Sequence, residues 1–207
     1  MVLYLTRRSR FNQLTPIVIY VLYTLLSILI ISSLIGKLTG KQFLGFRIFT
    51  IGEGVLLMYY LRRVLRSVKA KKLLFLLTIF FVLFALFDLI TNIDADTFDS
   101  LPTVFECLII IGFSTFYLYE QLGTPESLFL YSTPTFWIIV GLMLFFSGNF
   151  FVFIYAQSNS ESPEFQTTFG LINTILSFIE NILFLIAFII ARQQSKTIKS
   201  NIVAKTT

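Results

Sequence analysis

The chain has 207 residues, of which 56% are hydrophobic and 13% are charged, and its mean hydropathy is +0.84. A soluble domain carries about 25% charged residues, so this composition excludes an ordinary soluble protein and indicates an integral membrane protein. The formal net charge is +5. No basic patch stands next to a nucleic-acid-reading element, so we expect no nucleic-acid partner.

Six apolar segments of about 18 to 24 residues each have the length that one transmembrane helix needs. We therefore predict an all-α integral membrane protein, a bundle of six transmembrane helices that forms a single domain over residues 1–207. The predicted helices cover residues 14–35, 43–61, 72–91, 101–121, 133–156 and 168–191. A transmembrane β-barrel would need short segments of alternating polarity, and stretches such as Phe80–Phe87 show no alternation.

The first apolar segment follows three arginines and therefore looks superficially like a secretory signal. Its apolar run from Pro16 to Ile35 is longer than the about 7 to 15 residues of a signal core, and it has no small-residue cleavage site. We therefore expect it to remain in the protein as the first helix.

The positions of the basic residues predict the orientation, because Lys and Arg in short loops stay on the cytoplasmic side. Thirteen of the sixteen basic residues fall before the first predicted helix, after the second or after the sixth, which places them on one side. The other side receives Lys37 and Lys41, with Arg47 at the start of the second helix. We predict a multi-pass protein of the inner (cytoplasmic) membrane with its N and C termini in the cytoplasm.

The predicted connection after the second helix, residues 61–72, is the most basic segment of the chain. Its cations could bind anionic lipid headgroups, at about 1 kcal/mol each, or an acidic cytoplasmic partner, or could simply fix the topology. On the opposite side, residues 91–100 and 157–167 are predicted to be polar loops without Lys or Arg, and residues 157–164 to be a flexible turn. The candidate headgroup ligands are Arg62, Arg63, Arg66 and Lys69.

A single cysteine and the absence of histidine exclude several kinds of site. Cys107 alone cannot form an internal disulfide or a CxxC pair, and no His-based zinc or haem site is available. The chain also lacks the GxSxG, HExxH and phosphate-loop motifs of common enzyme classes. We therefore expect a protein that is not an enzyme and that has no cofactor and no metal.

Three glutamates lie in predicted helices that cross the membrane in the same direction. Each follows a hydroxyl residue by three positions, as Thr50/Glu53, Thr103/Glu106 and Ser177/Glu180. A charged side chain at the bilayer centre costs about 2.5 to 3.5 kcal/mol on insertion scales, so such residues usually face a protein interior or a water-filled cavity and carry function. Because desolvation penalises the charged form, we expect Glu53 and Glu180 to be neutral unless a cation or several donors compensate.

Further polar residues interrupt the last two predicted helices. In residues 168–191 they recur at helical spacing on one face, and in residues 133–156 the segment Ser147–Asn149 would let a neighbouring backbone approach closely. We expect these faces to converge with the glutamates in a ligand or proton site, and hydrogen bonding between helices is the structural alternative. The candidate site residues are Glu53, Glu106, Asn149, Asn173, Ser177, Glu180 and Asn181.

Glu106 admits two further interpretations. Thr103 follows Pro102 closely, so Thr103 and Glu106 could form an N-terminal capping box, in which the two residues bond each other's backbone. Glu106 also shares its expected depth with Arg47, the one basic residue within a predicted helix. We therefore state as a hypothesis that Arg47 and Glu106 form an ion pair across helices.

Six short stretches of the C-terminal half carry a resemblance. They are Phe105–Ile110, Tyr119–Leu122, Pro125–Leu128, Pro134–Ile138, Phe146–Phe151 and Ile172–Leu176. In these stretches the chain resembles a largely uncharacterised group of small, Phe/Ile/Leu-rich polytopic inner-membrane proteins typical of Bacteroidota. The resemblance implies an association with sensor kinases and supplies no catalytic residue.

Two functions fit these observations. The first is a sensory or signalling-partner module that has a buried polar site and acts through a kinase or another membrane protein. The alternative is a small proton- or cation-coupled transporter or channel that uses the same glutamates, and six helices would make it small enough to work as a homo-oligomer. A structural or assembly subunit is a third reading.

Overall fold

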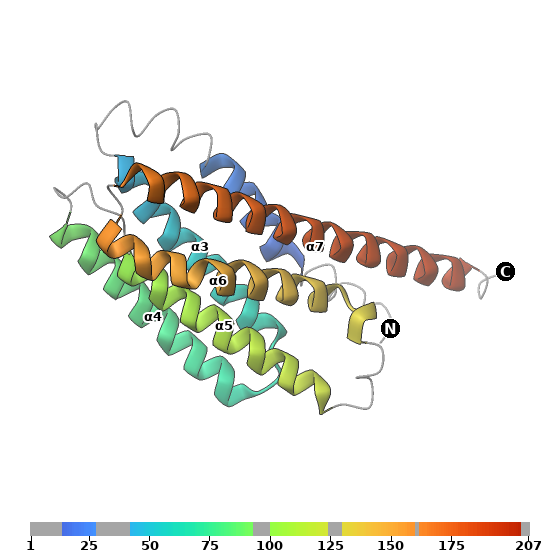
Figure 1. Ribbon diagram of the computed structural model, residues 1–207. Helices are drawn as coiled ribbons and strands as arrows, with labels where there is room; N and C mark the ends of the chain where they lie inside the picture. The colour runs from blue at the N-terminus through green and yellow to red at the C-terminus, as the bar shows by residue number, and fades with distance from the viewer. Residues whose placement is uncertain (1–13, 28–41, 93–99, 124–129, 160–161, 204–207) are drawn as a thin grey trace.

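The fold is taken from a computed structural model of the chain (Figure 1). The structure describes residues 14–27, 42–92, 100–123, 130–159 and 162–203. Throughout these residues the regular secondary structure is helical and contains no strand, so the all-α prediction is confirmed.

Five of the helices in the described part of the chain are long and apolar enough to cross a membrane, and a sixth is shorter. The shorter one covers the first half of the first predicted span, whose remainder lies outside the described residues. The helices support a membrane protein by their length and composition. They are Leu14–Ser27, α3 (Gln42–Val64), α4 (Val68–Thr91), α5 (Ser100–Leu122), α6 (Pro134–Asn159) and α7 (Pro163–Val203).

The helices pack as one bundle in which α3, α5 and α6 are central (Figure 1). In an 18-residue apolar stretch of each of these helices 50%, 50% and 44% of the residues are buried, compared with 17% in α4 and in α7. Helix α6 lies between α5 and α7, and α4 packs on α3 and α5. The helix Leu14–Ser27 contacts both α3 and α7, because the Tyr23 ring stacks on Phe49 and the Tyr20 ring meets the edge of Phe184.

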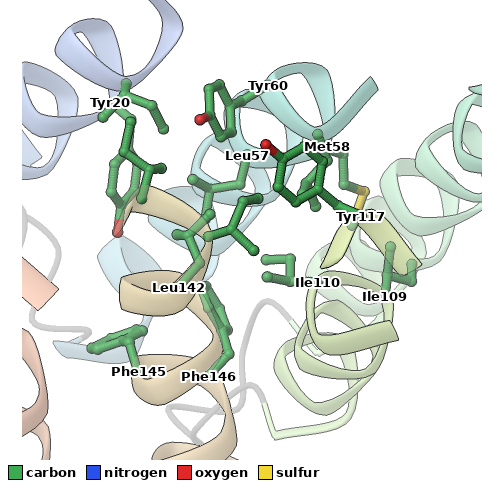
Figure 2. Close-up of a cluster of buried hydrophobic side chains, with 14 of the residues drawn as sticks. Tyr20, Leu57, Met58, Tyr60, Ile109, Ile110, Tyr117, Leu142, Phe145 and Phe146 are labelled. Atoms are coloured by element: carbon green, nitrogen blue, oxygen red, sulfur yellow. The ribbon is translucent and has the colours of Figure 1, made fainter. Parts of the chain in front are cut away.

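One apolar core runs through the bundle, and Figure 2 shows part of it. All five labelled helices contribute buried side chains, among them Leu57, Phe81, Ile110, Leu142 and Phe184. The outer faces of α4 and α7 instead carry large exposed apolar side chains. This distribution suits a protein whose solvent is lipid, since apolar side chains need not be hidden from hydrocarbon.

Two glycines allow α6 and α7 to approach closely. A Cβ built on Gly148 would lie 2.6 Å from Cδ1 of Leu176, and one built on Gly141 would lie 3.2 Å from the Phe184 ring. Each glycine therefore receives a large side chain of α7. Residues 147–149 were expected to admit a neighbouring backbone, and at Gly148 the neighbour that enters is instead the Leu176 side chain.

The connection between α3 and α4 is much shorter than predicted. Only residues 65–67 lie between the two helices, so the prediction of a basic loop over residues 61–72 is wrong. Lys and Arg are good helix formers, and the ends of both helices continue through them. Ser67 caps α4, because its side-chain oxygen accepts a hydrogen bond from the Ala70 nitrogen at 3.3 Å.

The connection between α6 and α7 is also shorter than predicted. Helix α6 continues to Asn159 and α7 begins at Pro163, so the predicted polar loop over residues 157–167 is wrong for most of its length. Proline suits the first position of a helix, and the carbonyl oxygen of Ser162 accepts from the Gln166 nitrogen at 3.0 Å. The helix start is therefore encoded by Ser162 and Pro163.

Helix α7 continues well past residue 191, where its prediction ended. It has 41 residues and is about 60 Å long at 1.5 Å per residue, twice the thickness of the hydrocarbon layer. The prediction stopped where the apolar residues stop, but polar residues such as Gln and Lys also continue a helix. In Figure 1 the C-terminal part of α7 extends beyond the other labelled helices.

Candidate functional site

Glu53 lies in the middle of α3 between two glycines, and its side chain is buried. The Tyr20 hydroxyl donates a hydrogen bond to Oε1 of Glu53 at 2.9 Å. A Cβ on Gly52 would meet Tyr23, and a Cβ on Gly54 would meet Phe81 of α4. The two glycines thus let the helix Leu14–Ser27 and α4 come close to α3 on either side of the carboxylate.

Glu106 is buried on α5 with an exposed fraction of 1%. Its carboxylate lies against α3, because a Cβ built on Gly54 would be 2.9 Å from Oε1 of Glu106. The capping-box interpretation is wrong, since α5 begins at Ser100 and Thr103 already lies within the helix. Glu106 therefore belongs to the interior of the bundle, next to the residue that follows Glu53.

Glu180 is buried on α7 and lies close enough to Glu53 for their charges to interact. The hydroxyl of Tyr20 is within electrostatic range of Glu53, Glu106 and Glu180. Three helices that are far apart in the sequence therefore place buried glutamates within electrostatic range of one tyrosine, which is hydrogen-bonded to Glu53. Within the described part of the chain, Oε1 of Glu180 has no hydrogen-bond partner. We call Tyr20, Glu53, Glu106 and Glu180 the carboxylate cluster.

The hydroxyl residues that precede the glutamates do not act alike. The Thr50 side chain is buried, and its oxygen donates to the Phe46 carbonyl of its own helix at 3.1 Å. Thr103 is also buried, whereas Ser177 is half-buried. In α3, therefore, the hydroxyl three residues before the glutamate bonds the helix backbone.

The candidate asparagines do not all turn inward. Asn149 is fully buried on α6, where its amide nitrogen donates to the Phe145 carbonyl at 3.1 Å, and Asn173 is half-buried. Asn181 is exposed, and its amide nitrogen donates to the Ser177 carbonyl at 2.7 Å. The prediction that Asn181 shares the face of Glu180 is wrong, because consecutive residues of a helix point about 100° apart.

Arg47 is buried on α3, and its described hydrogen bond joins it to the end of α4. The guanidinium NH1 donates to the Asn92 carbonyl at 2.8 Å. Asn92 is the C-cap of α4, where unpaired carbonyl groups and the helix dipole favour a cation. The ion pair between Arg47 and Glu106 stays a prediction.

A second polar arrangement, at the other end of α3, was not found from the sequence. The carboxylate of Glu120 on α5 accepts from the Arg66 backbone nitrogen at 2.8 Å and from the Ser67 backbone nitrogen at 2.7 Å. The Arg66 side chain donates to Gln121 at 3.1 Å. Glu120 therefore caps the start of α4 from a neighbouring helix.

The predicted headgroup ligands Arg62, Arg63, Arg66 and Lys69 are all exposed around this turn.

Tyr20 is the residue of the carboxylate cluster that sequence analysis missed. It stands 33 positions before Glu53 and reads as one more aromatic residue in an apolar segment. One signal was available, because a tyrosine deep within a membrane-spanning segment usually needs a partner for its hydroxyl group. Which partner it finds depends on how the helices pack.

The carboxylate cluster can bind and release protons within the bundle. A proton needs only one carboxylate oxygen, and a hydroxyl donor nearby can stabilise the anion that remains. In the described part of the chain, no three acidic or cysteine side chains are grouped closely enough to hold a metal ion.

Comparisons with protein-family models, with curated proteins and with solved structures find no match. The function is therefore argued from this geometry.

Proposed function

We propose that the protein is a small proton-conducting membrane transporter in which Glu53 and Glu180 carry the proton. The observation that supports this function is the burial of one glutamate on each of α3, α5 and α7, together with the hydrogen bond from the Tyr20 hydroxyl to Glu53. Ionisable residues inside membrane-spanning segments typically mark proton relays and ion pathways.

The chemistry of the carboxylate cluster supports one exchangeable proton. Two carboxylates whose charges interact across a buried space resist being ionised together, so the pair tends to retain a proton between them. Tyr20 donates to Glu53 and thereby favours the anionic form of Glu53 over that of Glu180, whose Oε1 has no hydrogen-bond partner among the described residues.

Proton flux in liposomes tests the proposal. The purified full chain is reconstituted in vesicles that contain a dye quenched at low pH, and the external medium is acidified. We expect dye quenching above that of empty vesicles, and a loss of at least about tenfold in both Glu53→Gln and Glu180→Gln, because an amide cannot exchange the proton. Wild-type vesicles that behave like empty ones, or variants that keep the wild-type rate, contradict the proposal.

Glu164→Gln is the matched control for this experiment. Glu164 is exposed in the first turn of α7, so the same substitution removes a carboxylate outside the cluster. Its flux should equal that of the wild type.

The transporter is proposed to cross the inner membrane six times, with both termini in the cytoplasm. The distribution of Lys and Arg supports this orientation. The even number of crossings requires the first apolar segment to span the membrane as well.

A sensory module that acts through a cytoplasmic partner is the second candidate function, and α7 favours it. The spanning segment of α7 ends at Gln194, yet the helix continues to Val203. This extension carries Lys196 and Lys199 and could dock a kinase. Deleting residues 195–207 separates the two functions. If the protein is a transporter, the shortened chain should conduct protons as fast as the full chain. If it is a signalling module, neither chain should conduct protons, and a kinase should co-purify with the full chain but not with the shortened one.

A further inference from the structure

The face of α7 that turns away from the bundle carries a polar group at membrane depth. The spanning segment of α7 covers residues 164–194, so Asn181 lies near its middle, and its side chain is exposed. The hydrogen bond to the Ser177 carbonyl uses one of the two amide N–H groups. In a single copy, the remaining N–H and the Oδ1 oxygen would face hydrocarbon, which offers neither a donor nor an acceptor.

Asn181 terminates a regular row of small and polar residues. The row advances by three, four, three and four positions, which is the spacing of the contact positions in a two-helix coiled coil. Four of its members are exposed, and Ser177 is half-buried. The next position of the row is Phe184, which is buried within the chain. The row therefore ends at Asn181 and comprises Thr167, Gly170, Thr174, Ser177 and Asn181.

Gly170 leaves space for the backbone of another helix. A Cβ built on Gly170 would have no atom within 4 Å, whereas Gly141 and Gly148 are each filled by a side chain of a neighbouring helix. Gly112 on α5 is equally open, but its flanking outward residues Leu108 and Phe116 are large and apolar. Small residues around a glycine are typical of helix contacts in membranes, and large apolar residues are typical of lipid contacts.

We propose that this row of α7 packs against α7 of a second copy of the chain and that the protein is a homodimer. Two copies with the same orientation place their α7 helices parallel to each other, so a two-fold axis along the membrane normal brings the two Asn181 residues to the same depth. An amide side chain both donates and accepts, so the pair can form reciprocal hydrogen bonds. This self-complementarity is the reason that the occupant is a second copy, because the unpaired groups of Asn181 are those that another Asn181 satisfies.

Dimerisation in liposomes tests the proposal with a pair of matched glycine variants. The fraction of dimer is measured by counting photobleaching steps of the labelled full chain as it is diluted into lipid. Gly170→Ile should abolish the dimer, because the added side chain separates the helices. Gly112→Ile should leave it unchanged. A Cβ at either position has no atom of the same copy within 4 Å, so both variants should fold. A wild-type chain that stays monomeric, or equal behaviour of the two variants, overturns the proposal.

The contribution of the amide is measured in the same assay. Interhelical polar contacts in membranes contribute about 0.6 to 2 kcal/mol, so Asn181→Leu should weaken dimerisation by about 3- to 30-fold. Thr115→Leu is the control, because Thr115 is an exposed polar residue of α5 whose hydroxyl bonds its own helix. An Asn181→Leu chain that dimerises as well as Thr115→Leu contradicts the role of Asn181.

Disulfide cross-linking locates the contact independently. The native Cys107 is buried, so the background from this residue should be low. Oxidation of Asn181→Cys in membranes should give a covalent dimer, and oxidation of Thr115→Cys should not. Cross-linking of both positions, or of neither, argues against an interface centred on α7. Proton flux is measured in a separate experiment. The dimer can therefore be confirmed when the transport proposal is contradicted, and the transport proposal can be confirmed when the dimer is contradicted.

Discussion

At the scale of single residues, the carboxylate cluster depends on one hydrogen bond and on one missing side chain. Tyr20 donates to Glu53 from a neighbouring helix, and Gly54 leaves room for the Glu106 carboxylate. Both features join helices that are distant in the sequence. A buried acid that kept no such neighbours would carry the full cost of its desolvation.

Replacing Tyr20 by phenylalanine should destabilise the protein. The substitution removes the donor to Glu53 while keeping the ring that packs on Phe184, so we expect a loss of about 0.5 to 3 kcal/mol in the free energy of unfolding. Unfolding in mixed micelles by increasing SDS measures the change. Tyr119→Phe is the control, because Tyr119 is 72% exposed. Equal stability of the two variants would show that the hydrogen bond contributes nothing.

Filling the space beside Gly54 should be more damaging than filling an open glycine. A Cβ at Gly54 would lie 2.5 Å from the Phe81 ring and 2.9 Å from the Glu106 carboxylate, so Gly54→Ala should cost about 1 to 3 kcal/mol. Gly112→Ala, where nothing lies within 4 Å, should be neutral or slightly stabilising because alanine favours helix. Thermal unfolding of both variants in the same detergent decides the comparison.

The sequence located the three glutamates but not the way in which they meet. Their unusual cost in lipid is a local property, so Glu53, Glu106 and Glu180 could be selected from hydropathy alone. Tyr20 and the outward turn of Asn181 could not, because they depend on the rotation of each helix about its axis. That rotation follows from which side chains pack, such as Leu176 against Gly148.

At the scale of elements, the α3–α4 hairpin is held by a cap from α5. Residues 65–67 form the turn before α4, and Glu120 accepts from two of its backbone nitrogens, those of Arg66 and Ser67. A carboxylate at a helix N-terminus also interacts favourably with the helix dipole. The basic residues beside this turn therefore lie on helix ends that are fixed in position, with the Arg62 guanidinium 4.6 Å from the centre of the Phe75 ring.

Removing this cap should loosen the start of α4. We expect Glu120→Ala to cost about 1 to 2 kcal/mol and to accelerate amide hydrogen exchange at residues 66–70, since two backbone nitrogens lose their acceptor. Mass spectrometry of the protein in detergent measures the exchange. Glu164→Ala, at the exposed start of α7, controls for the loss of a negative charge. Unchanged exchange at residues 66–70 in Glu120→Ala would contradict the capping role.

At the scale of the whole molecule, the bundle has an interior made by α3, α5 and α6 and a periphery made by α4 and α7. Glu53, Glu106 and Glu180 are buried, Glu180 on the inward face of the peripheral helix α7, and many large apolar side chains are exposed. Asn181 is an exception, and it motivates the proposed dimer. Orientation in the membrane belongs to the same scale, since it depends on the summed charge of the segments on each side.

Reporter fusions test the proposed orientation. A fluorescent protein fused after residue 207 should fluoresce, and alkaline phosphatase at the same place should be inactive, because both results indicate a cytoplasmic C terminus. Phosphatase inserted in the short connection between α6 and α7 should be active. An active phosphatase at the C terminus would reverse the orientation and remove the support that the basic residues give to it.

The sequence by itself determined that this is a helical membrane protein, because a run of apolar residues long enough to cross the hydrocarbon layer is a local property that no distant residue alters. The sequence also identified Glu53, Glu106 and Glu180 as acidic residues that are costly to place in a membrane. The tertiary structure decided where the helices end, that Tyr20 and three glutamates gather, that Glu120 caps α4 and that Asn181 faces outward. These features depend on contacts between residues far apart in the chain, and the contacts exist only after the helices have packed at particular rotations and depths.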